Sequence, residues 1–96
     1  MSPSFVYILA SQRNGTLYIG VARNLLQRME QHCKGDGSSF VRKYGVHRLV
    51  YFEEYPLYVD AIRRETNLKR WKRAWRLALI EKHNPQWSDL LENWHR

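Results

Sequence analysis

Two β-type segments around an Asn-Gly pair place the strongest constraint on how this chain can fold. The segments 5–10 (FVYILA) and 16–21 (TLYIGV) are rich in the β-branched and aromatic residues that favour strands. The dipeptide Asn14-Gly15 between them is typical of a two-residue hairpin turn. The sequence therefore predicts an antiparallel hairpin near the N-terminus, with Arg13 paired with Thr16.

Tyr7 and Tyr18 are expected to lie on the same face of this hairpin. Tyr7 is an even number of residues from Arg13, and Tyr18 is an even number from Thr16. Side chains alternate between the two faces of a strand, so even offsets preserve the face. The expectation holds for any loop of even length and fails for an odd one.

A helix is expected after the hairpin, with Asn24 as its N-cap and Gln27 at the reciprocal capping position. It is predicted to run to about residue 33. Its apolar residues form one stripe: Leu25, Leu26, Met29 and Cys33. Arg28 and His32 are related as i and i+4 and border that stripe, so they are predicted neighbours at the edge of the core.

The rest of the chain predicts a third strand and more helices. Residues 48–55 read as a strand, and 57–83 as a long helical stretch with a break near Arg73. A last short helix is expected after Asn84, as its cap, with Pro85 at its first position. The predicted fold class is α+β: a small three-stranded antiparallel sheet flanked by helices, with a ββαβα core plus a C-terminal helix. The length of 96 residues suits one domain over 1–96.

Composition narrows the class of protein. The single cysteine excludes a disulfide framework and a cysteine-rich zinc site, and favours the reducing cytoplasm. No apolar run approaches the roughly 20 residues that cross a bilayer, so no membrane association is expected. Sixteen Lys and Arg against nine Asp and Glu give a net charge of +7. Such a charge attracts polyanions, nucleic acid first.

Glu65 is an acidic residue in an apolar position. On a helical projection it falls in the same stripe as Ala61, Ile62 and Leu68. A carboxylate facing inward is costly unless it is paired or binds a metal. Two interpretations remain open: a salt bridge, with Arg28 as the candidate partner, or a metal-binding or catalytic carboxylate in a cleft.

Seven basic residues between positions 63 and 76 make the long helix a candidate nucleic-acid surface. The candidates for phosphate contacts are Arg63, Arg64, Lys69 and Lys72. The alternative is an ordinary solvated helix face. Trp71 and Trp75 project beside Leu68, so both are expected to pack in the core.

Together these residues resemble the GIY-YIG nuclease family, in particular small stand-alone members related to the N-terminal nuclease domain of a bacterial excinuclease. Tyr18-Ile19-Gly20 matches the second half of the family signature, and Phe5-Val6-Tyr7 stands in place of the first half with its tyrosine kept. Arg28 and His32 match the Arg-x-x-x-His/Tyr pattern, and Glu65 matches the metal-binding glutamate. The resemblance covers nearly the whole chain.

The resemblance implies metal-assisted hydrolysis of a phosphodiester. Glu65 would hold one divalent cation, Mg²⁺ or Mn²⁺. Tyr7 would act as a general base on the attacking water, and cationic neighbours would have to lower its pKa from about 10. Tyr18 would position water or phosphate. Arg28 would stabilise charge on the phosphate, and His32 would bind the phosphate or relay a proton.

Further positions follow from the same resemblance. Gly20 would let the backbone turn tightly into the following helix. Arg23 would substitute for a lysine that excinuclease-like members carry where Val21 stands. Asn84 would match an asparagine that some members use, or would be a helix cap. Without the resemblance, Tyr7 and Tyr18 read as ordinary strand aromatics.

The predicted function is a metal-dependent endonuclease acting on branched, damaged or single-stranded DNA, with RNA as the less favoured substrate. The alternatives are a non-catalytic nucleic-acid-binding module and a member of a larger repair complex. For the last, the tryptophans Trp87 and Trp94 near the C-terminus would contact the protein partner or would instead close the core.

Overall fold

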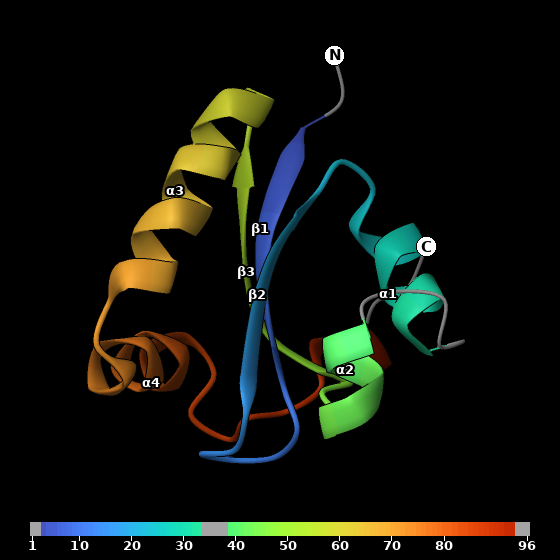
Figure 1. The fold of residues 1–96 in the computed structure, drawn as a ribbon, viewed down its shortest axis with the longest axis vertical. Coiled ribbons are helices and arrows are strands. Elements are labelled where there is room, and N and C mark those ends of the chain that lie inside the picture. The colour runs from blue at the N-terminus through green and yellow to red at the C-terminus, as the bar shows by residue number, and fades with distance from the viewer. Residues whose placement is uncertain (1–2, 34–38, 94–96) are drawn as a thin grey trace.

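Three strands form one antiparallel sheet in the computed structural model, which describes residues 3–33 and 39–93. The strands are β1 (Ser4–Ala10), β2 (Leu17–Ala22) and β3 (Arg48–Tyr55), and their order in the sheet is β2-β1-β3. β1 is therefore central, and β2 lies at one edge (Figure 1). The predicted α+β class with a three-stranded antiparallel sheet is confirmed.

Helices cover both faces of the sheet. α1 (Leu25–Cys33) and α2 (Ser39–Tyr44) lie on one face, and α3 (Tyr58–Arg70) and α4 (Arg73–His83) lie on the other (Figure 1). A short 3₁₀ helix, η1 (Leu90–Asn93), follows near the C-terminus. The Asn24 carboxamide oxygen accepts the backbone N–H of Gln27 at 3.0 Å, which confirms the predicted N-cap. The break between α3 and α4 also lies where the sequence predicts it.

The hairpin loop is longer than predicted. The backbone N–H of Ser11 donates to the carbonyl of Thr16 at 3.0 Å, so the loop comprises residues 12–15, with Asn14 at φ 58°. The Ser11 hydroxyl accepts a hydrogen bond from the backbone N–H of Thr16, also at 3.0 Å, and this second bond stabilises the longer loop. The predicted Arg13–Thr16 pairing is therefore wrong. The loop length is still even, so Tyr7 and Tyr18 share a face, as expected.

Two side-chain clusters pack on the two faces of the sheet. Under α3 and α4 the buried residues include Val6, Ile8, Leu68 and Ile80. Under α1 and α2 they include Tyr7, Leu9, Leu25 and Met29. Trp87 is fully buried in the first cluster, so it closes the core and cannot serve a protein partner. Trp94 lies outside the described residues.

Trp75 does not pack in the core, contrary to the prediction. It is 54% exposed, whereas Trp71 packs partly against the buried cluster. The prediction projected Trp75 on the same helical wheel as Leu68, without allowing for the break. The extended backbone of Trp71 and Lys72 separates α3 from α4. The break therefore starts α4 on a new axis, and Trp75 no longer follows the apolar stripe of α3.

Asn84 ends α4 instead of beginning another helix. Its backbone N–H donates to the Ile80 carbonyl at 2.7 Å. Its buried carboxamide donates to the carbonyls of Val50 at 3.0 Å and Ser88 at 2.9 Å, and accepts the Ser88 N–H at 3.1 Å. The predicted short helix after Pro85 is absent from the described residues before Leu90. Asn84 links the C-terminal segment to β3, and both protons of its side-chain amide are used in these bonds.

We expect Asn84→Ala to lower the free energy of unfolding by about 1–3 kcal/mol, because it leaves the buried carbonyl of Val50 without this partner and removes two part-buried bonds to Ser88. Urea denaturation followed by tryptophan fluorescence measures the change. Asn67→Ala, an exposed position on α3, is the matched control and should have little effect. Equal stability of the two variants would contradict this structural role.

Candidate active site

A tyrosine and a histidine meet on the α1 side of the sheet. The Tyr7 hydroxyl lies 3.2 Å from Nε2 of His32, and both residues are buried. Tyr7 is on the central strand, and His32 is in the last turn of α1. Leu25 and Met29 pack α1 against the sheet, and this packing carries the His32 ring onto Tyr7. The sequence predicted His32 at the edge of the core, and the structure brings it into contact with the first signature tyrosine.

The absence of a side chain at Gly20 leaves room for the hydroxyl end of the Tyr7 ring. Tyr7 and Gly20 face each other in the β1–β2 register. A Cβ atom added to Gly20 would lie 2.5 Å from the Tyr7 hydroxyl oxygen, closer than such atoms approach. Gly20 lies inside β2, so the prediction that it serves a tight turn into the helix is wrong. The predicted two-residue turn would have paired Tyr7 with Ala22, which hid this contact.

Tyr18 completes a cluster of three rings. Its ring centroid lies 6.3 Å from that of Tyr7 and 5.8 Å from that of His32. The Tyr7 and His32 rings are 6.1 Å apart and meet edge to face. Tyr18 is half-buried, whereas Tyr7 is fully buried. Tyr18 therefore stands between the buried Tyr7–His32 pair and solvent.

Arg28 supplies the positive charge at this cluster. Its guanidinium donates to the Val21 carbonyl at 3.3 Å, and its positive charge acts to lower the pKa of the Tyr7 hydroxyl. Among the described residues the ion-pair partner of Glu65 is Lys69, with Nζ 3.3 Å from Oε2. Of the two interpretations of Glu65 left open by the sequence, a salt bridge with Arg28 is not found among the described residues. Arg28 instead lies with Tyr7, where a forked donor can bind a phosphate.

Burial sets the protonation states of Tyr7 and His32. It raises the pKa of Tyr7 to about 12, and the nearby Tyr18 adds to this, while Arg28 acts in the opposite direction. Burial also lowers the pKa of His32, and the charges of Arg28 and His47 lower it further. At neutral pH Tyr7 is therefore a phenol and His32 a neutral imidazole. The expected cationic neighbour of Tyr7 is present, but burial outweighs its effect.

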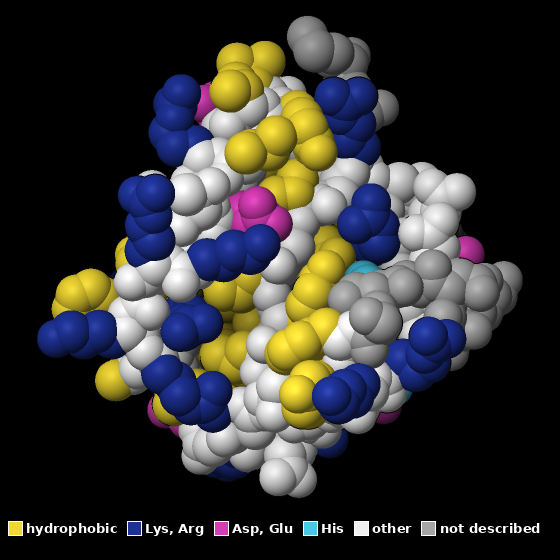
Figure 2. Space-filling model, in the orientation of Figure 1, with side chains coloured by type: hydrophobic (Ala, Val, Ile, Leu, Met, Phe, Trp, Pro, Cys, Tyr) yellow, Lys and Arg dark blue, Asp and Glu magenta, His cyan; other side chains and the backbone are white. Residues whose placement is uncertain are grey.

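Glu65 approaches the same place from the other side of the sheet. It lies on α3 between Ala61 and Leu68, which are buried in the opposite cluster, and its own side chain is 21% exposed. Burial is the main cause of the raised pKa of Tyr7, and the charge of Glu65 adds to it. Figure 2 shows a small acidic patch near the centre of the face in view, with Lys and Arg side chains on both sides.

The donor set suits a hard cation. No group of three or more His, Cys, Asp and Glu ligands occurs within residues 3–33 and 39–93. A single carboxylate is how proteins often hold Mg²⁺, with water and substrate phosphate filling the remaining positions. Glu65 fits that pattern. A site that depends on several nitrogen or sulfur ligands does not fit these residues.

The predicted basic residues lie in different surroundings. Arg23 stacks over the Tyr58 ring at 4.3 Å and lines, with Arg28, a hollow of about 320 Å³ at the start of α1. Arg63 makes an exposed pair with Asp60 at 3.5 Å, and Lys72 lies 5.6 Å from the Trp75 ring centroid.

Arg64 differs from the other basic candidates on the long helical stretch. Its guanidinium makes hydrogen bonds of 2.9 Å to both carboxylate oxygens of Glu53 and lies 5.0 Å from the Trp71 ring centroid. Glu53 also accepts the hydroxyls of Tyr51 and Tyr55. Arg64 therefore belongs to a polar network on the α3 face, where Glu53 already neutralises its charge.

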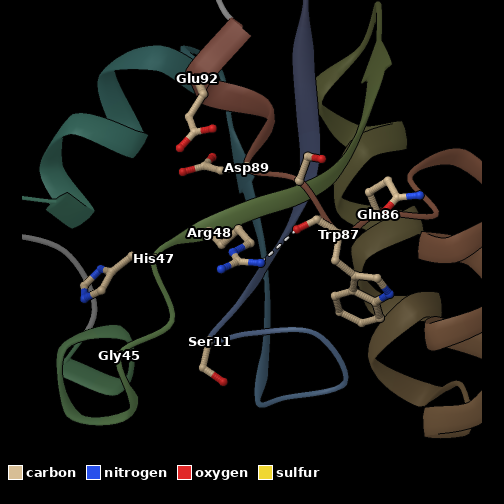
Figure 3. A pocket seen from close by; sticks show the side chains of 9 residues that line it. Ser11, Gly45, His47, Arg48, Gln86, Trp87, Asp89 and Glu92 are labelled. Carbon is tan, nitrogen blue, oxygen red and sulfur yellow. Dashed lines mark hydrogen bonds between the residues drawn. The ribbon is translucent and has the colours of Figure 1, made fainter.

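A larger hollow, of about 560 Å³, contains none of the predicted catalytic residues (Figure 3). Its polar groups hold the C-terminal segment against β3. Arg48 donates to the Trp87 carbonyl at 3.1 Å, and Asp89 accepts the backbone N–H groups of Leu49 and Leu91. These bonds indicate a structural role for the side chains around this hollow.

Comparison with known proteins identifies the family. The model of the GIY-YIG catalytic domain matches residues 3–78. The chain is 35% identical over 81 residues to UPF0213 proteins of Staphylococcus aureus strains Mu3 and Mu50, covering 84% of this chain and 98% of each relative. The solution NMR structure of the UPF0213 protein BH0048 from Bacillus halodurans superposes with a TM-score of 0.58 at 26% identity, over 94% of this chain and 95% of that one. None of the helices in the described residues could span a membrane. The chain therefore belongs to the GIY-YIG family, a family of endonucleases that in general use a divalent metal ion.

Proposed function

We propose that this protein is a metal-dependent endonuclease that hydrolyses phosphodiester bonds in DNA. The observation that carries the proposal is the buried contact between the Tyr7 hydroxyl and His32 Nε2 at 3.2 Å, beside the Arg28 guanidinium. A protein that only binds nucleic acid does not require a buried phenol in contact with a neutral imidazole beside an arginine. The proposed location is the cytoplasm.

Tyr7 and His32 together can take a proton from water. Tyr7 is protonated at neutral pH, so it cannot act as a tyrosinate base by itself. Its phenolic proton can pass to Nε2 of His32 while its oxygen receives a proton from the attacking water. The resulting hydroxide bonds to phosphorus as the bond to the leaving oxygen breaks. Burial and the charge of Arg28 both lower the pKa of His32, and negative charge on the bound phosphate offsets the contribution of Arg28.

The other site residues bind and orient the phosphate. Arg28 donates to its non-bridging oxygens and stabilises the charge that develops there. Tyr18 borders the buried pair and positions the water or the phosphate. Glu65 would hold the Mg²⁺ or Mn²⁺ ion, competing with Lys69 for its carboxylate. When bound, such a cation polarises the phosphate and stabilises the leaving oxygen.

The basic face is the proposed nucleic-acid surface. Arg23, Arg63, Lys69 and Lys72 are the proposed phosphate contacts, and Lys and Arg side chains flank the face in Figure 2. The net charge of +7 supports strong attraction to DNA at low salt. The raised pKa of Tyr7 favours one alternative, a nucleic-acid-binding module with little catalysis.

We expect cleavage to require a divalent cation. Supercoiled plasmid and a labelled branched DNA would be incubated with the purified protein in Mg²⁺, Mn²⁺ or EDTA, and nicked products would be resolved on gels. EDTA should stop cleavage, and excess Mg²⁺ added afterwards should restore it. Cleavage that continues in EDTA would contradict the proposed mechanism. Binding without cleavage in every condition would support the binding module instead.

A further inference from the structure

A row of aromatic rings leads from the candidate active site to the surface of α2. Tyr18 lies 5.9 Å from Phe40, and Phe40 lies 4.7 Å from Tyr44, measured between ring centroids. The rings become more exposed along the row, from the half-buried Tyr18 to Phe40 at 38% and Tyr44 at 47%. The row therefore connects the ring cluster of Tyr7, Tyr18 and His32 with solvent.

The α2 end of the row combines aromatic rings one helical turn apart with positive charge, as nucleic-acid-binding surfaces do. Phe40 and Tyr44 are one helical turn apart on α2, with Arg42 and Lys43 between them in sequence. These four residues line a hollow of about 480 Å³. The Lys43 ammonium lies 5.5 Å from the Tyr44 ring centroid. Aromatic faces beside cations are the combination that binds single strands, because bases stack on rings while cations attract phosphates.

We propose that Phe40 and Tyr44 form a stacking platform for unpaired bases next to the scissile phosphate. This inference rests on the proposed nuclease function and specifies its substrate class as single-stranded nucleic acid or an unpaired segment of a larger DNA. In a duplex, bases are paired and stacked, and their faces are not available to side chains. A strand with free bases can lay them on these rings, and Tyr18 then continues the row to Tyr7 and His32.

The platform does not depend on the metal or on cleavage, so binding can test it alone. A fluorescein-labelled oligothymidylate and a duplex of equal length would be titrated with the protein in EDTA, at fixed salt, and followed by anisotropy. We expect tighter binding of the single strand. The double variant Phe40→Leu/Tyr44→Leu should weaken that binding by about 10- to 100-fold, since each ring lost costs roughly 5-fold or more. Duplex binding should change by much less.

Two further variants control for loss of aromatic surface and for misfolding. Trp75→Ala removes an exposed ring that also has a lysine beside it but lies on α4, outside the row, and should leave oligothymidylate binding within about 2-fold. Tyr44→Trp keeps a ring and should bind at least as tightly as the wild type. Far-UV circular dichroism checks that all variants are folded.

The outcomes separate this inference from the proposed function. Equal affinity of the wild type for single strand and duplex, or an equal loss in Trp75→Ala, would overturn the platform even if metal-dependent cleavage is observed. Ring-dependent binding of single strands by a protein that cleaves no DNA would support the platform and overturn the nuclease. Loss of single-strand preference in the double variant, with retained preference in Tyr44→Trp, is the result we expect.

Discussion

Tyr7→Phe is expected to slow DNA cleavage by about 10²- to 10⁴-fold, the range that positioned acid–base groups contribute. The substitution removes only the hydroxyl that lies 3.2 Å from His32 Nε2. The aromatic ring stays in place between β2 and α1, so the fold should persist. In the proposed mechanism the proton of the attacking water reaches the imidazole through this hydroxyl, so the variant lacks that path. Single-turnover cleavage of a labelled DNA in saturating Mg²⁺ measures the change.

Tyr51→Phe is the matched control for this variant. Tyr51 is also a buried tyrosine of the sheet, its hydroxyl also has a side-chain partner, and burial also raises its pKa. It lies in the opposite cluster, under α3 and α4. Its substitution should leave the cleavage rate within about 2-fold, apart from any loss of folded protein. A similar fall in both variants would show that stability, and not proton transfer, controls the rate.

Glu65→Gln is expected to reduce cleavage to the background of the assay and to abolish its response to Mg²⁺ or Mn²⁺. The amide keeps the size of the side chain but provides a much weaker ligand for a hard cation. The fold should be unaffected, because the substitution removes one partly exposed ion pair with Lys69, worth at most about 1 kcal/mol. Nicking of supercoiled plasmid across a range of cation concentrations measures the effect.

Asp60→Asn provides the matched control for Glu65→Gln. Asp60 is another carboxylate of α3 in an exposed ion pair, with Arg63 at 3.5 Å. Its loss should leave the cation dependence unchanged. If Glu65→Gln cleaves as fast as the wild type at all cation concentrations, Glu65 does not hold the metal, and the observed activity requires another source.

The sequence was sufficient to predict the sheet and the family. Strand periodicity gave Arg48–Tyr55 as the structure has it, and the Asn24 cap located the start of α1. Even offsets placed Tyr7 and Tyr18 on one face even though the turn was predicted too short. Any loop with an even number of residues leaves the two tyrosines on the same face. This prediction therefore remained correct although the loop was predicted two residues too short.

The remaining details depend on contacts that no local pattern encodes. The role of Gly20 requires knowing which residue lies opposite Tyr7, and the two-residue shift of register concealed it. The exposure of Trp75 depends on how the helix axis changes at Lys72. The hydrogen bonds of Asn84 join residues far apart in the chain. The sequence shows two aromatic residues four apart, at positions 40 and 44. Their contact with Tyr18 could not be predicted, because Tyr18 lies far away in the sequence.

The candidate site takes its two halves from different packing units. Tyr7 and His32 are held by the cluster under α1, whereas Glu65 is carried by a helix anchored through Leu68 in the other cluster. A defect deep under α3 can therefore shift the carboxylate while the phenol–imidazole contact stays intact. If Glu65 holds the proposed metal ion, inactivating mutations should therefore include buried positions under α3 that contact neither the metal nor the DNA, because they change the position of this helix.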